Sequence, residues 1–86
     1  MAKIRVGGRA VSRVGRLLRN ISSDASVAPD VRANAAYWAA AVRGTMERRD
    51  LQTLAWILLD ASNEKGISLT QRRSARYWAA NLEARC

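Results

Sequence analysis

Two stretches of the chain, Tyr37-Trp38-Ala39-Ala40 and Tyr77-Trp78-Ala79-Ala80, share one sequence and lie 40 residues apart. The same shift superposes further pairs, which include Leu18 on Leu58, Val27 on Ile67, Arg32 on Arg72 and Ala35 on Ala75. A fixed period indicates copies of one supersecondary unit. Two copies are too few for a solenoid, so we expect two helical hairpins that share one core. Chance similarity in an alanine-rich chain is the alternative.

Turn signals set the expected limits of the first hairpin. The spacing of apolar residues predicts a helix over 9–22, which ends in a serine-rich cluster. Pro29 fits the first turn of the next helix, because the N–H that proline lacks has no partner there. We expect this second helix to run to Arg43, with Gly44 as the left-handed closing residue.

The second hairpin carries its own capping signals. Thr45 is the expected N-cap of the third helix, and Glu47 in its first turn suits the helix dipole. This helix is expected to close near Glu64. Ser68 and Gln71 have the spacing of a capping box, which opens the fourth helix.

No stretch shows the alternation of a strand, so we expect none. The predicted fold is all-α, a compact four-helix bundle of two helical hairpins related by a 40-residue pseudo-repeat. The chain of 86 residues is long enough for one core and too short for two. We therefore predict a single basic helical domain over 1–86, with a flexible lead-in over 1–8, hairpin one over 9–43 and hairpin two over 45–85.

Composition excludes several kinds of chemistry. The chain has no histidine and a single cysteine, Cys86. A catalytic triad built on histidine, a zinc site built on histidine or cysteine, and an internal disulfide framework are therefore excluded. No two acidic residues have the spacing of a catalytic pair, and the serines lack a neighbouring base. We predict a protein that is not an enzyme and uses no cofactor or metal.

The net charge is concentrated at the start of the chain. Thirteen arginines and two lysines stand against seven acidic residues, which gives a net charge of +8. Residues 1–21 contribute +6 of this charge and hold no acid. An arginine-rich start without acids is also typical of a mitochondrial transit peptide. The repeat makes this segment part of the fold instead.

The arginines are the main indication of function. At 100° per residue, those of the first helix fall on the side opposite its apolar residues, where they can follow a phosphate backbone. A second cluster opens the fourth helix, whose N-terminus itself favours phosphate. We therefore predict docking on nucleic acid or another anionic surface through Arg9, Arg13, Arg16, Arg19, Arg72, Arg73 and Arg76.

The tryptophans divide into two kinds. Trp38 and Trp78 fall on apolar stripes and are expected in the core, while the adjacent tyrosines turn toward the core edge. Trp56 falls on the polar side of the third helix. Either residues 1–6 cover it, or it is a protein-interface candidate together with Arg49, since tryptophan and arginine are frequent interface anchors.

Three other interpretations of the basic face stay open. The first is a small regulator or inhibitor that binds an acidic surface of a larger protein through the arginine face and Trp56. The second is an anionic membrane surface, for which the first helix has a suitable basic amphipathic form, although no apolar run reaches the length of a membrane span. The third is a solvated surface without a specific partner. Self-association through the third helix and Trp56 is a further expectation, and we expect a cytoplasmic protein of bacterial or phage setting.

Overall fold

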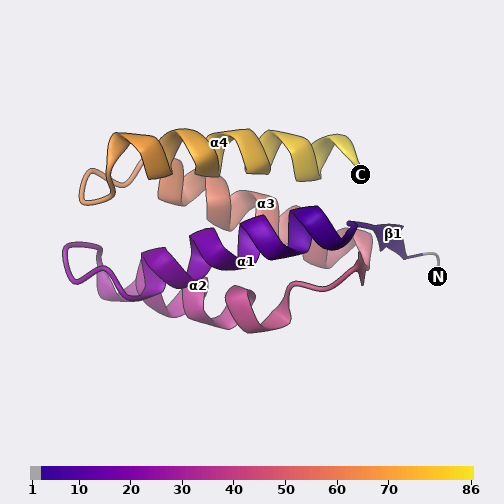
Figure 1. Cartoon of the computed structure of the whole chain (residues 1–86), viewed down its shortest axis with the longest axis horizontal. Helices are drawn as coiled ribbons and strands as arrows, with labels where there is room; N and C mark the ends of the chain where they lie inside the picture. Colours follow the sequence, from indigo (N-terminus) through magenta and orange to yellow (C-terminus); the bar gives the residue numbers. More distant parts are fainter. Residues whose placement is uncertain (1–2) are drawn as a thin grey trace.

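The computed structural model describes residues 3–86, which form four helices and one small sheet (Figure 1). The elements follow in the order β1 (Ile4–Arg5), α1 (Gly8–Ser22), α2 (Pro29–Ala41), β2 (Thr45–Met46), α3 (Arg48–Ser62) and α4 (Leu69–Ala84). The molecule measures 38 × 20 × 20 Å. The expected helical fold with four helices is confirmed.

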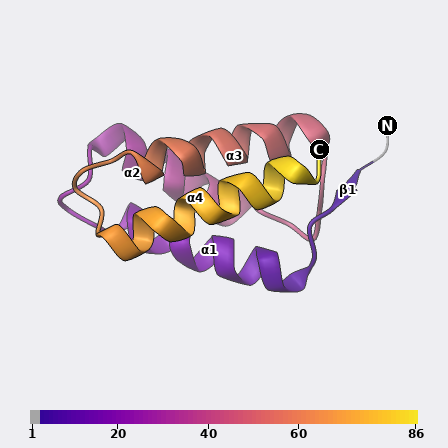
Figure 2. The same ribbon diagram turned by 90° about the horizontal axis from the view of Figure 1, so that it is seen from above.

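The helices pack as two hairpins placed side by side. α1 packs mainly on α2 and α3 mainly on α4, while contacts of α2 with α3 and of α1 with α4 join the hairpins. The turn of each hairpin lies at the same end of the molecule, opposite the N-terminal strand (Figures 1 and 2). As a result, α1 and α4 run next to each other along one side, and α2 and α3 form the opposite side (Figure 2).

The core combines large side chains from two helices with small ones from the others. α1 and α3 contribute most of the large aliphatic groups, and Leu18, Leu54 and Leu58 are all fully buried. α2 and α4 turn alanines inward, such as Ala35 and Ala75. Small residues opposite large ones let helices approach closely without leaving voids. The core therefore sits between all four helices.

The sheet corrects the expectation that the chain holds no strand. Ile4 pairs with Met46 and Arg5 with Thr45 in antiparallel register. The Val6 N–H continues this pairing with a 2.8 Å hydrogen bond to the Gly44 carbonyl, and the Val6 side chain is buried. Each strand has two residues, too few to give an alternating pattern that the sequence could reveal. The expected lead-in thus contains a strand and a core residue.

Several helix limits also differ from those expected. The third helix begins at Arg48, because Thr45 belongs to β2 and does not cap a helix. α2 ends at Ala41, and Gly44 has no positive φ, so it is not a left-handed closing residue. The expected cap of α4 is confirmed: the Ser68 hydroxyl accepts a 3.3 Å hydrogen bond from the Gln71 N–H.

The aromatic side chains lie further out than expected. Trp38 and Trp78 are half-buried at the rim of the core, and do not fill its centre, which is occupied by leucines and alanines. Tyr37 and Tyr77 are exposed. Within residues 3–86, no helix combines the length and the apolar character needed to cross a bilayer.

Candidate nucleic-acid interface

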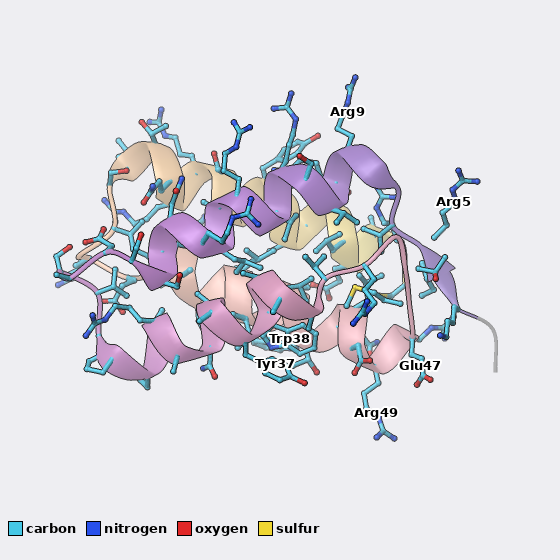
Figure 3. The ribbon with its side chains drawn as sticks, turned by 60° about the horizontal axis from the view of Figure 1, so that its bottom comes forward. Arg5, Arg9, Tyr37, Trp38, Glu47 and Arg49 are labelled. Carbon is cyan, nitrogen blue, oxygen red and sulfur yellow. The ribbon has the colours of Figure 1, made fainter. Side chains whose placement is uncertain are left out.

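Three arginines of α1 point away from the core. Val14, Leu17 and Ile21 anchor the inner side of α1, and their burial fixes the rotation of the helix about its axis. Arg9, Arg13 and Arg16 are consequently exposed, at steps of four and three residues that keep side chains on one side of a helix. Figure 3 shows Arg9 extending away from the ribbon.

Residues of α4 form the second wall of the site. Arg73 and Tyr77 lie four residues apart, so both side chains stand on the same outer side of α4. Trp78 is turned toward the core edge and is half-buried. Its ring meets that of Tyr77 edge-on, with centroids 5.0 Å apart and planes at 88°. This contact orients the Tyr77 ring while leaving it 60% exposed.

The two walls enclose an open groove, which we call the α1/α4 groove. Its wider part, a hollow of about 550 Å³, is lined by Arg9, Arg13, Arg73, Ser74, Tyr77 and Trp78. A narrower part continues toward the hairpin turns, where Arg13, Arg16, Leu17, Asn20, Gln71, Ser74 and Trp78 line a hollow of about 200 Å³. Every charged side chain in these two sets is an arginine. The groove therefore presents cationic donors along its length and an aromatic pair in its middle.

The helices that form the groove carry the excess charge of the bundle. α1 has four arginines and no acid, and α4 has three arginines and Glu83, which gives the two helices a net charge of +6. α2 and α3 each hold equal numbers of bases and acids and are neutral. Among residues 3–86, no arginine guanidinium group lies close enough to a carboxylate to form a salt bridge. The arginines of the groove are free to meet an external anion.

The structure separates some of the predicted arginines from this groove. Arg19 folds over Gly15 on the other flank of α1: a Cβ at Gly15 would lie 3.3 Å from the Arg19 Nη1 and 3.8 Å from Val42, beyond the end of α2. Arg72 and Arg76 line a different hollow beside Ser62 at the end of α3, which Arg73 also borders. The Nε atom of Arg72 is buried and has no hydrogen-bond partner.

Trp56 stands apart from the groove. It is 65% exposed on α3, as the helical spacing predicts. Of residues 1–6, the expected cover, Met1 and Ala2 lie outside the described residues, and Val6 is buried in the core. Arg49 is exposed on the same helix and extends away from the body in Figure 3. Because α3 contributes to the side opposite the α1/α4 groove, one flat partner surface cannot contact both regions.

The sequence interpretation missed the polar and aromatic residues of the groove. Helical spacing predicts Trp78 in the core and Tyr77 at its edge, and it indicates no binding role for Asn20, Gln71 or Ser74. One signal was present, since Tyr77 follows Arg73 by four residues on one helix face. That α1 and α4 lie side by side is a feature of the tertiary structure, and no local pattern in the sequence indicates it.

The groove has side chains with the chemistry to bind an anion. Its guanidinium groups can each donate several hydrogen bonds to phosphate oxygens, and its rings can contact a flat apolar group. Among residues 3–86, no three side chains from His, Cys, Asp and Glu are grouped so that they could hold a metal ion. Searches for similar proteins found no matching family model, no matching curated protein and no matching solved structure.

Proposed function

We propose that this protein is a small cytoplasmic, non-enzymatic protein that docks on the phosphate backbone of nucleic acid through the α1/α4 groove. One observation carries the proposal: Arg9 and Arg13 from α1 and Arg73 from α4 line one hollow together with Tyr77 and Trp78. Arginine at phosphates supplies affinity without regard to base sequence, and an aromatic ring gives a surface for a base or a sugar.

The charge distribution supports the same proposal. The electrostatic field of all the charges of a protein draws it toward nucleic acid. Here the net charge of +6 on α1 and α4 makes that field strongest on one side of the molecule. The neutral α2 and α3 on the opposite side favour a single orientation on the nucleic acid.

The 40-residue pseudo-repeat is also part of what we propose. We infer two copies of one hairpin, because α1 and α3 each have 15 residues and begin at Gly8 and Arg48, which are related by the same shift of 40. The Tyr37–Trp38 rings also meet edge-on, with centroids 5.2 Å apart, as the Tyr77–Trp78 rings do. Shifted by 40 residues, Arg13, Arg16 and Arg73 correspond to Thr53, Trp56 and Ala33. Arg9 corresponds to Arg49, so three of the four arginines that line the α1/α4 groove have no basic counterpart on α2 and α3.

Binding measured against salt concentration tests the proposal. Fluorescence anisotropy with labelled duplex and single-stranded DNA should give affinities whose logarithm falls linearly with the logarithm of salt concentration. Four phosphate contacts correspond to a slope of about −3 to −4 on duplex DNA, or roughly a 100-fold loss between 50 and 200 mM salt. A slope near zero on both probes, or no binding at the lower salt concentration, would overturn the proposal.

A charge-matched pair of variants locates the site. Arg13→Glu and Arg48→Glu lower the net charge by the same amount, but only Arg13 lines the α1/α4 groove. Arg13→Glu should weaken binding by at least about tenfold and reduce the salt slope by about 1. Arg48→Glu should have a much smaller effect. Equal effects of the two variants would mean that net charge alone drives binding and that the groove is not the site.

A protein partner is the second candidate function. The 65% exposure of Trp56 favours it, since a large exposed aromatic group is a frequent centre of protein interfaces. Trp56→Ala should then be among the most damaging substitutions for partner binding, whereas it should leave nucleic-acid affinity within about threefold of the original.

A further inference from the structure

The outer face of α3 is exposed and carries both signs of charge. Each of its members lies three or four residues from another member, and they include Trp56, which is 65% exposed. All of them are exposed: Arg49, Gln52, Thr53, Trp56, Asp60 and Asn63. Figure 3 shows Arg49 of α3 and Tyr37 of α2 on the same side of the molecule. Tyr37 is also 65% exposed, so this side adds a second aromatic ring.

The order of charges on this face makes it complementary to itself. Arg49 lies near the start of α3 and Asp60 near its end, 11 residues or about 16 Å further along the helix. If two copies of α3 run antiparallel about a twofold axis between Leu54 and Ala55, position 49 of one copy faces position 60 of the other. The same axis sets Trp56 against Thr53 of the partner.

The net charge of the molecule favours contact at this face. Two copies with a charge of +8 each repel one another, and α1 and α4 carry the largest part of that charge. α3 is neutral and lies on the opposite side of the bundle (Figure 2). An approach through α3 keeps the arginines of α1 and α4 in one copy away from those in the other and leaves both grooves open.

We propose that two copies of the chain associate through α3 in antiparallel orientation, with each Trp56 packed on the partner's Thr53 and each Arg49 opposite the partner's Asp60. This association does not depend on nucleic-acid binding. It presents two α1/α4 grooves on opposite sides of one dimer, so a dimer can contact two segments of an anionic polymer.

Sedimentation equilibrium of the full chain across a range of concentrations tests the association. We expect a monomer–dimer equilibrium whose dissociation constant rises at least about tenfold in Trp56→Ala. The matched control is Tyr77→Ala, which removes an aromatic ring of similar exposure from the other side and should leave the equilibrium unchanged. Circular dichroism checks that both variants keep their helices. A monomer at every concentration, or equal effects of the two variants, would overturn the proposal.

Charge exchange tests the antiparallel register. In Arg49→Asp alone, or Asp60→Arg alone, both facing pairs become like charges, so each variant should dimerise about tenfold more weakly than the original chain. In a mixture of the two variants, position 49 of each chain faces an opposite charge at position 60 of its partner. The mixture should therefore form heterodimers with nearly the original affinity. A mixture that associates no better than either variant alone would overturn the register.

Discussion

The Ser26 hydroxyl donates a 2.8 Å hydrogen bond to the carbonyl oxygen of Gly66. The bond joins the turn of the first hairpin to the turn of the second and therefore ties the two hairpins together at one end. The approach is close enough that a Cβ at Gly66 would collide with the carbonyl oxygen of Ser26. At the other end, the pairing of β1 with β2 makes a second link between the hairpins.

Gly66→Ala should destabilise the fold, because the added methyl group forces the two turns apart. The expected loss is about 1–3 kcal/mol in the free energy of unfolding, measured by urea denaturation. Gly44→Ala is the matched control, since a Cβ at Gly44 meets open space, and it should change stability by less than about 0.5 kcal/mol. A Gly66→Ala variant as stable as Gly44→Ala would contradict the close contact between the turns.

Gly15→Ala should have the opposite effect. Gly15 lies inside α1, where alanine is favoured over glycine by about 0.8–1 kcal/mol. The nearest atom to the new methyl group would be the end of the exposed, flexible Arg19 side chain, which can move aside. We expect a gain of about 0.5–1 kcal/mol in thermal or urea unfolding. A loss of stability would show that Arg19 is held over Gly15 more firmly than its exposure indicates.

Ser68→Ala should weaken α4 at its start. The Ser68 hydroxyl accepts the Gln71 N–H, and loss of such a cap costs about 1 kcal/mol. Thr70→Ala, on an exposed residue in the same turn, is the control and should cost less than half as much. The comparison is made by urea denaturation. Equal losses from the two substitutions would argue against the cap.

Asp24 gives the first turn a dependence on pH. The Ser26 hydroxyl, 2.6 Å from the carboxylate, and the Ser26 N–H at 3.0 Å hold the pKa of Asp24 below its ordinary value, and Arg32 contributes further. The single hydroxyl proton is shared between this carboxylate and the Gly66 carbonyl. Because the pKa is lowered in the folded state, the resulting stability is present above the pKa of the unfolded chain. It is lost as the pH falls through the folded value.

Ser26→Ala should raise the pKa of Asp24 toward its ordinary value in an NMR titration of the carboxyl carbons. Ser23→Ala is the control, because the Ser23 hydroxyl bonds to the backbone carbonyls of Arg19 and Asn20. It should leave the Asp24 titration unchanged. If Ser26→Ala leaves the titration where it was, Ser26 is not the cause of the lowered pKa.

Much of the helical fold could be predicted from local sequence, and the sheet could not. The period of apolar residues and the Ser68 cap identify helices, because helical hydrogen bonds join residues four apart and leave a local pattern. β1 and β2 have two residues each, and their pairing joins Ile4 to Met46 across the first hairpin. Such a contact depends on how the helices pack. The error at Thr45 has the same origin, since pairing with Arg5 prevents it from capping α3.

The sequence could predict which arginines belong to the candidate site, but not how the helices that carry them are placed. Helical spacing identifies the exposed sides of Arg9 and Arg13, but it cannot show that α4 lies beside them with Arg73. The separation of Arg19 from the groove could be predicted, because helical spacing places it about 80° around α1 from Arg9. The half-burial of Trp78 follows from packing as well: alanines let the helices approach, and the large indole is left at the rim.

The most direct test of the central claim uses the three tryptophan side chains as reporters. In a ¹⁵N NMR titration with a short DNA, the indole N–H signal of Trp78, which lines the α1/α4 groove, should shift together with the amides of α1 and α4. The indole signals of Trp38 and Trp56, on α2 and α3, should stay in place. Shifts centred on Trp56, with Trp78 unchanged, would contradict the assignment of the α1/α4 groove as the nucleic-acid interface.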